Sequence, residues 1–383
     1  MNATQRDLIM QRWHVMQHEL IPELKNEVGL LSARLEKVIH TLEWVRIDAF
    51  VASSWCGVGR PPHDRAALAS AFVAKAVLGL TSTTALIERL QIDCALRRIC
   101  GFSMWKRLPD ASTFSRAFEE FADAKLAERV HAALVTQQLG PSLIGHISRD
   151  GTAIEAREKP VRKLACDATT VATDAITGAA AKPKRGRPRK GEGRDAQEVR
   201  APKIKVITQQ LGQHLTDMLD ALPRVCDRGT KCNAQGYKTS WNGYKLHIDT
   251  ADCGVPVSAL LTSASVHDSQ TAIPLALMTQ SRVTHCYDLM DAAYCSEEIR
   301  RHSRSLGHVP LIDHNPRGGE KIAFDPAEAT RYKERSQAER TNARLKDEFG
   351  GRHVKVRGHI KVMSHLMFGL LALTADQLLR LLR

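Results

Sequence analysis

The sequence lacks the signatures of several common protein classes. It has no Walker phosphate loop, no nucleophile elbow and no papain-like motif, so neither nucleotide hydrolysis nor a Ser or Cys nucleophile is indicated. Its nine cysteines are odd in number and spread over 383 residues, which predicts reduced thiols in a cytosol rather than a disulfide framework. The most apolar run, His365 to Ala375, is too short for a membrane span and is followed by Asp376. We therefore expect no membrane span, and the N-terminal residues show no apolar signal core.

The composition is that of a folded protein with an excess of positive charge. Hydrophobic residues make up 43% and charged residues 25%, which excludes a wholly disordered chain. The length exceeds what one hydrophobic core usually supports, so two or more domains are expected. Lys and Arg number 55 against 42 Asp and Glu, giving a net charge of +13. This excess indicates a polyanionic partner, nucleic acid before membrane.

Residues 1–140 predict an all-helical domain for DNA binding or dimerisation, because Ala, Leu, Glu and Arg dominate and strand-like alternation is scarce. Asp110 after Pro109 predicts a helix beginning at Ala111. Around this helix and the loop before it lie five basic residues: Arg97, Arg98, Lys106, Arg107 and Arg116. Two interpretations stay open, a helix-turn-helix-like DNA-binding unit with Arg116 as a contact, or a helical packing domain with a solvated basic face.

Residues 141–159 and 236–352 predict an α/β core. The expected strands are Leu143 to Ile154, two stretches on either side of the turn Gly254-Val255-Pro256, and the segments THCYDLMDAAY and HVPLIDHN. A capping box from Asp325 to Glu328 predicts a long helix that continues to Gly350. Residues 353–383 predict a C-terminal apolar helix that either supports dimerisation or caps the core.

Residues 160–235 predict a flexible basic insertion, since helical and strand periodicity disappear. Within it, KPKRGRPRK contains Arg185, Gly186 and Arg187, a pattern that resembles an AT-hook. Gly lets the backbone approach the floor of the minor groove, while the Arg side chains lie along it. We favour DNA contact over a generic basic linker.

Four residues of the predicted long helix share one face. At 100° per residue, Tyr332, Arg335, Glu339 and Lys346 fall within an arc of about 60°. This stripe places one acid between two cations and a phenol, so the acid could hold a metal while the cations grip phosphate. Alone, the stripe is far more typical of a solvated ion-pair ladder.

Two aspartates at strand ends change this balance. Asp150 follows the apolar strand LIGHISR, and Asp291 follows YDLM. A carboxylate at a strand end of a buried sheet is costly unless it is paired, metal-bound or exposed in the crevice. With Glu339, these acids could clamp a phosphodiester through two divalent cations. His267 and Asp268 follow another strand. Asp268 is read first as a helix N-cap, with a place beside the metals as the alternative.

Asp150, Asp291 and Glu339, with the spacing Tyr-x2-Arg-x3-Glu-x6-Lys, resemble the DDE transposases of bacterial insertion sequences, of the insertion-sequence-4 type with its Tyr-Arg-Glu-Lys signature. The segments SRDGTAIEAREKP, LMDAAY and YKERSQAERTNARLKDEFGG are similar to that family as well. The resemblance implies an RNase H-like mixed-sheet catalytic core and metal-dependent strand cleavage and strand transfer. It makes Asp150, Asp291 and Glu339 the catalytic metal ligands for two Mg²⁺ ions, with Mn²⁺ as a substitute.

The resemblance further implies that Tyr332, Arg335 and Lys346 contact transposon-end DNA. Its partners would be transposon-end and target DNA, bound by a homodimer or a larger assembly in the cytoplasm, at the bacterial nucleoid. Two alternatives remain: an RNase H-like nuclease that cuts without joining, and a non-catalytic DNA-binding regulator.

Overall fold

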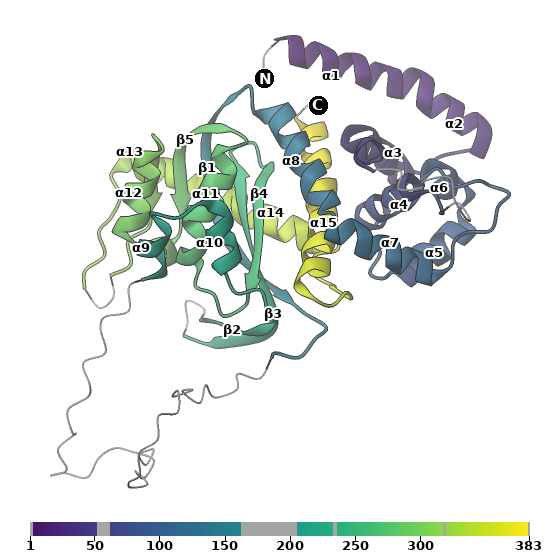
Figure 1. Cartoon of the computed structure of the whole chain (residues 1–383). Coiled ribbons are helices and arrows are strands. Elements are labelled where there is room, and N and C mark those ends of the chain that lie inside the picture. Colours follow the sequence, from purple (N-terminus) through teal and green to yellow (C-terminus); the bar gives the residue numbers. More distant parts are fainter. Residues whose placement is uncertain (1–2, 52–61, 162–204, 233–235, 317–318, 382–383) are drawn as a thin grey trace, which may run out of the picture.

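A computed structural model describes residues 3–51, 62–161, 205–232, 236–316 and 319–381 of the chain. Its centre is a mixed six-stranded sheet (Figure 1). β1 pairs antiparallel with β3 and parallel with β5, β5 pairs parallel with β6, and β3 pairs antiparallel with β2 and β4. The strands are β1 (Leu143–Glu155), β2 (Asp227–Cys232), β3 (Lys238–Ala251), β4 (Pro256–Ser263), β5 (Thr284–Met290) and β6 (Val309–Ile312). This mixed α/β arrangement is consistent with an RNase H-like core.

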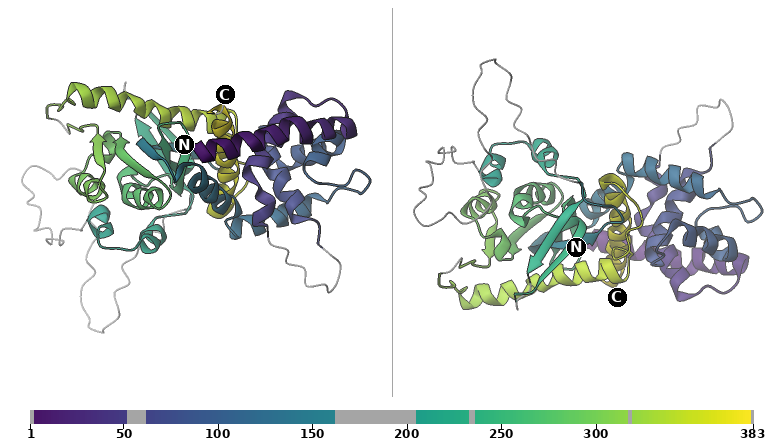
Figure 2. Two further views of the ribbon diagram at one scale, coloured as in Figure 1. Left: turned by 90° about the horizontal axis from the view of Figure 1, so that it is seen from above. Right: turned by 90° about the horizontal axis from the view of Figure 1, so that it is seen from below.

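Helices cover both faces of the sheet (Figure 2). One face is crossed by α14 (Ser336–Asp347), which contacts β1 and β3 and follows α13 (Pro326–Tyr332) and the 3₁₀ turn η5 (Lys333–Arg335). The other face is covered by α11 (Ala272–Gln280), against β3 and β4, and by α12 (Glu297–Ser305), against β6. Short 3₁₀ turns precede these two helices, η3 (Asp268–Thr271) and η4 (Ala292–Tyr294). The two faces of β1 therefore meet different helices.

The described residues before β1 are helical. They form α1 (Ala3–Val15), η1 (Met16–Leu20), α2 (Ile21–Val28), α3 (Ala33–Val45), η2 (Ile47–Phe50), α4 (Arg65–Val77), α5 (Thr83–Ile92), α6 (Cys94–Ile99), α7 (Ala111–Asp123) and α8 (Leu126–Leu139). Side chains cap several of these helices, as when Ser82 accepts a hydrogen bond from the Ala85 amide at 3.0 Å. These helices do not have a core of their own, because one continuous hydrophobic cluster joins them to β1, β3 and β4.

The C-terminal helix α15 (His359–Arg380) lies at the centre of that cluster. It packs against α8, α4, α3 and α7 on one side and against β4 on the other. Its length and apolar composition would suffice to cross a membrane, but most of its most apolar stretch is buried inside the molecule. The structure thus favours the core-capping interpretation of this helix and makes it the joint between the helical part and the sheet (Figure 1).

Two stretches differ from the sequence-based expectation. Residues 205–232 were expected inside an insertion, but they form α9 (Val206–Gln210), α10 (Leu215–Ala221) and β2. β2 pairs with β3, and α9 and α10 join α11 and α12 in a second apolar cluster. The capping box is present, with the Asp325 amide donating to the Glu328 carboxylate at 3.4 Å. The helix it begins is interrupted by η5 and ends at Asp347.

A buried ion pair joins β1 to β3 on the face of the sheet that α11 covers. Arg149 donates through Nε and Nη2 to the two carboxylate oxygens of Asp249, each at 2.7 Å. The two residues are cross-strand partners and both side chains are essentially inaccessible to solvent. Thr279 of α11 donates to the same carboxylate at 2.7 Å. A bidentate pair of this kind fixes the register of the strands and ties α11 to them.

Asp249→Asn is expected to lower the free energy of unfolding by about 3–5 kcal/mol, because the buried Arg149 guanidinium would lose its counter-charge. The double variant Arg149→Met/Asp249→Leu removes both charges and should recover most of the loss. Chemical unfolding followed by circular dichroism measures both. Asp220→Asn, an exposed carboxylate on α10, is the control and should unfold like the wild type. A double variant no more stable than the single one would contradict this account.

Candidate active site

The sheet register brings Asp150 and Asp291 together. Arg149 of β1 is the parallel partner of Met290 of β5. Asp150 is the next residue of β1 and Asp291 directly follows the end of β5, so the two occupy equivalent positions. The prediction of Asp150 at a strand end was wrong, because β1 continues to Glu155 by pairing with β3. Asp291 caps η4, accepting a hydrogen bond from the Ala293 amide at 3.0 Å. The carboxyl ends of parallel strands are where ligands bind in open α/β sheets.

Helix α14 brings the third acid to the same place. Side chains alternate along β1, so Arg149 faces α11 while Asp150 faces α14. Asn342 of α14 donates to Asp150 Oδ2 at 2.9 Å. Arg335 lies between two acids, with Nη1 at 3.7 Å from Asp150 Oδ1 and Nη2 donating to Glu339 Oε1 at 2.5 Å. Asp150, Asp291, Arg335 and Glu339 therefore converge at the β1–β5 edge.

Tyr332 and Lys346 extend the site along the same helical segment. The Tyr332 hydroxyl donates to the Met290 carbonyl at 3.1 Å, so its ring lies over the end of β5 next to Asp291. Phe324 stacks on that ring with centroids 4.7 Å apart. Lys346 is half-buried, and its pKa is lowered first by burial and then by Arg352 and Lys231. The charges that act on Lys346 are Arg352, Lys231, Glu155 and Asp347, and none of the three acids is among them.

The electrostatics of the two aspartates reflect burial and crowding. Burial raises the pKa of Asp150 to about 6, with Asp291 adding to the rise, while Arg335 and Lys231 oppose it. The pKa of Asp291 is also raised, by burial and then by Asp268. Like charges held close in a partly desolvated site favour protonation unless a cation enters. Both raised pKa values therefore indicate that the nearby cations do not fully offset burial and repulsion between the acids.

The donor chemistry of the three acids suits a divalent metal, but their ligand atoms do not all lie within 4.8 Å of one another; among the described residues only His285, Asp288 and His308 form a group that close. Asp150, Asp291 and Glu339 supply only carboxylate oxygens, which are the ligands that Mg²⁺ and Mn²⁺ prefer. Glu339 is 58% exposed while Asp150 is 20% exposed, so the site opens to solvent on the α14 side. Arg335 already places one positive charge between two of the acids. A metal would meet the same need at the acids.

The remaining predicted DNA-binding residues lie elsewhere. Arg116 is on the exposed face of α7, among the helices on the far side of α15 from the sheet (Figure 1). Arg185, Gly186 and Arg187 of the AT-hook-like stretch lie outside the described residues. The structure therefore places Tyr332 and Arg335 beside the acids, Lys346 in the last turn of α14, and Arg116 away from them.

The structure also adds residues that the sequence-based prediction missed. Asn342 holds Asp150, and its position three residues after Glu339 on one helical face was an available signal. Lys231 of β2 acts on Asp150, Asp291 and Lys346, a role that the expected insertion concealed. The prediction of Asp268 as a helix N-cap was wrong. His267 is the N-cap of η3, and its Nδ1 accepts from the Ser269 amide at 3.4 Å.

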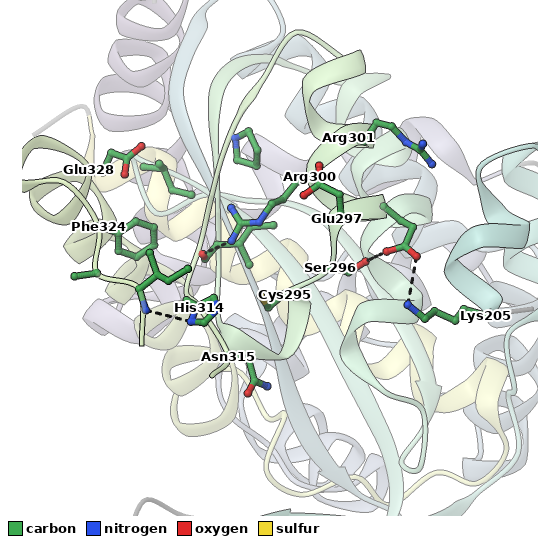
Figure 3. A pocket seen from close by; sticks show the side chains of 16 residues that line it. Lys205, Cys295, Ser296, Glu297, Arg300, Arg301, His314, Asn315, Phe324 and Glu328 are labelled. Atoms are coloured by element: carbon green, nitrogen blue, oxygen red, sulfur yellow. Dashed lines mark hydrogen bonds and ion pairs between the residues drawn. The ribbon is translucent and has the colours of Figure 1, made fainter. Parts of the chain in front are cut away.

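A cavity of about 860 Å³ adjoins this site at the end of β6 (Figure 3). Phe324, which stacks on Tyr332, forms part of its wall. Its charged lining is balanced between three cations and three acids, namely Lys205, Arg300, Arg301, Glu297, Glu298 and Glu328. Because these charges cancel, the cavity has no net attraction for a polyanion. We therefore take Asp150, Asp291 and Glu339, which lie outside the cavity, as the candidate active site.

The chain matches two families of transposase domains. Residues 195–375 match a family described as "Transposase DDE domain", and residues 19–120 match one described as "Transposase domain (DUF772)". Both matches support a DDE transposase. The match to the DDE domain contains Asp291 and Glu339, while Asp150 lies ahead of the matched residues. DDE transposases cut and join DNA and typically use divalent metals. No curated protein and no solved structure shows significant similarity to the chain.

Asp150→Asn is expected to make the metal-free protein more stable at neutral pH. The pKa of Asp150 rises from 3.8 to about 6 on folding, so the folded protein binds more protons in that window. Stability therefore falls as pH rises from about 4 to about 6. Above about pH 6, the free energy of unfolding of the variant should exceed that of the wild type by up to about 3 kcal/mol, since one pKa unit corresponds to about 1.4 kcal/mol.

Thermal unfolding in EDTA at about pH 4 and about pH 7.5 measures this gain, which should be confined to the higher pH. Asp220→Asn is the matched control and should behave like the wild type at both values. An equal gain for Asp150→Asn at both values would show that the effect is not electrostatic.

Proposed function

We propose that this protein is a DNA transposase that cleaves the ends of an insertion sequence and transfers the freed strand to target DNA. The observation that supports this most directly is the convergence of Asp150 and Asp291, from adjacent parallel strands, with Glu339 from α14. These three residues would hold two divalent ions, Mg²⁺ or in its place Mn²⁺. When bound, the ions supply an activated water or 3′-hydroxyl and stabilise the leaving oxygen. Binding alone would need no three-carboxylate cluster.

The residues around the acids have separate roles in this proposal. Tyr332, Arg335 and Lys346 bind the phosphate backbone of the transposon end, Arg335 with its planar guanidinium. Asn342 holds Asp150 in place through its hydrogen bond. Arg335, which pairs with Asp150 and Glu339 in the free protein, would turn to phosphate when metal takes over the acids. The insertion-sequence-4 type belongs to the same proposal.

The N-terminal helices and the basic stretch around Arg185 would bind DNA outside the site, in an assembly of at least two copies that joins two ends in the cytoplasm. Arg97 closes the α6–α7 loop by donating to the Ser103 carbonyl at 2.9 Å. The loop presents Trp105, which is almost fully exposed, beside Lys106. An exposed aromatic next to cations suits a nucleic-acid surface.

Glu339→Gln is expected to abolish cutting of a labelled duplex that carries both ends of the element. The loss should exceed about a hundredfold, since even outer-shell partners of a metal account for up to about that factor. Glu334→Gln changes an exposed acid on the same helical segment and should cut like the wild type. Reactions with Mg²⁺ or EDTA are resolved on denaturing gels, and joined products separate strand transfer from simple nuclease activity.

Two results would contradict the proposal. Binding of the ends without cutting by the wild type under any divalent metal would favour the non-catalytic regulator. Cutting without joined products would favour the nuclease.

Lys346→Gln is expected to weaken DNA binding by a purely electrostatic amount. Loss of one phosphate contact should reduce the slope of log affinity against log salt by about one, with little change in sequence preference. Lys333→Gln removes an exposed lysine from η5 and should leave the slope close to wild type. Fluorescence anisotropy over a salt series, in EDTA, measures the slopes. Equal slopes for wild type and Lys346→Gln would exclude the contact.

A further inference from the structure

Two histidines and an aspartate form a buried cluster apart from the three predicted acids. The ligand atoms of His285, Asp288 and His308 all lie within 4.8 Å of one another. Their side chains are 0%, 2% and 6% exposed. His285 and Asp288 belong to β5, and His308 directly precedes β6, the strand that pairs with β5. The cluster therefore joins two neighbouring strands inside the protein.

The Asp288 carboxylate contacts both imidazoles. Its Oδ1 lies 3.1 Å from His285 Nε2, and its Oδ2 lies 3.3 Å from His308 Nδ1. The two rings lie against each other, with centroids 3.7 Å apart. Ligand atoms about 2.0–2.1 Å from a tetrahedral zinc ion are about 3.4 Å from each other. The distances from the carboxylate to the two nitrogens are thus close to those of a shared ion.

One ring nitrogen of the cluster lacks a hydrogen bond. His308 Nδ1 faces Asp288 Oδ2, yet it has no hydrogen-bond partner among the described residues. Burying a polar nitrogen without a partner is unfavourable. A metal ion between the two atoms would give this nitrogen the partner that it lacks.

The carboxylate is held from α12 and needs a counter-charge. Ser303 of α12 donates to Asp288 Oδ2, and carboxylates that bind metals are usually hydrogen-bonded in this way. The Arg149 guanidinium is engaged by both oxygens of Asp249. Within the described part of the chain, the ion pairs of Asp288 are therefore with the two imidazoles. Its buried charge is balanced either by an imidazolium or by an ion held with the imidazoles.

The ligand set distinguishes this cluster from the three acids. Two imidazole nitrogens and one carboxylate oxygen suit Zn²⁺, whereas ligands that are all oxygen suit Mg²⁺ and Mn²⁺. Three protein ligands leave a fourth position for a water molecule. Because the side chains are buried, such an ion would join elements of the fold rather than meet a substrate.

We propose that His285, Asp288 and His308 form a structural zinc site that fastens β5 to the start of β6. Asp291 follows Asp288 by three residues, so the ion would also hold the strand that leads to Asp291. The inference does not depend on the proposed chemistry of the acids, and zinc binding tests it without any cleavage assay.

The test measures the zinc content of the full chain by mass spectrometry, as produced in medium that contains zinc and again after EDTA and reloading. The wild type should hold about one zinc ion per chain in the presence of excess Mg²⁺. Asp288→Asn and His308→Gln should each weaken zinc binding by more than about a hundredfold, because even outer-shell partners account for up to about that factor.

Two further variants locate the ion. His14 and His18 are exposed, four residues apart and with ring centroids 4.3 Å from each other, and such a pair on one helical face can also bind zinc. His14→Gln/His18→Gln should keep wild-type zinc affinity. Asp291→Asn should keep it as well, because the three acids form a separate site.

His308→Cys keeps the test decisive if His308→Gln does not fold. A thiolate in place of the imidazole remains a metal ligand, so Co²⁺ bound in place of zinc should gain a thiolate charge-transfer absorption that the wild type lacks.

Four results would overturn the inference. These are a wild type without zinc both as produced and after reloading, loss of zinc in His14→Gln/His18→Gln, unchanged zinc affinity in folded His308→Gln, and a Co²⁺ spectrum that His308→Cys does not alter. Unchanged affinity in His308→Gln would mean that the histidines serve only as hydrogen-bonding partners of Asp288.

Discussion

The buried pair between Arg149 and Asp249 is the interaction on which the geometry of the site depends. It is bidentate, fully desolvated and shared with Thr279 of α11. Because strand side chains alternate, fixing Arg149 on one face of β1 fixes Asp150 on the other. A shift of one residue would exchange the two faces, burying Asp150 and exposing Arg149. The ion pair makes such a shift costly, since it would leave two buried charges uncompensated. The position of Asp150 is thus secured from the opposite face of the sheet.

The site itself is an excess of negative charge restrained by nearby cations. Arg335 lies between Asp150 and Glu339, and Lys245 donates to Asp268. Lys231 lowers the pKa of both Asp150 and Asp291. These cations come from different elements, so none of them saturates the acids. In the proposed function the carboxylates would hold the metal and these cations would face phosphate, so metal and polyanion would each balance part of the site.

Helix α15 packs between the N-terminal helices and the sheet and joins them in one hydrophobic core. This helix is buried among α8, α4, α3 and α7 and contacts β4. Arg344 of α14 forms ion pairs with Glu348 and with Asp376 of α15, so the helix that carries Glu339 is also bound to this joint. DNA held on the helical part would therefore be presented to the acids in a fixed orientation.

The sequence by itself determined many of the local elements, while the three acids stay a prediction. The capping box at Asp325 and the turn at Gly254 depend on neighbours a few residues away, and such signals survive without tertiary context. Asp150 was expected at a strand end, but pairing with β3 carries β1 on to Glu155. The partners of these acids come from distant parts of the chain, and only the folded structure could pair them. Asn342 meets Asp150 across 192 positions, and Asp249 meets Arg149 across 100. β2 was hidden because its residues are mostly exposed and polar, and its place in the sheet depends on pairing with β3. Asp268 looked like a cap because its true partners, Lys245 and His247, lie on the neighbouring strand, and strand pairing is a property of the sheet rather than of either segment.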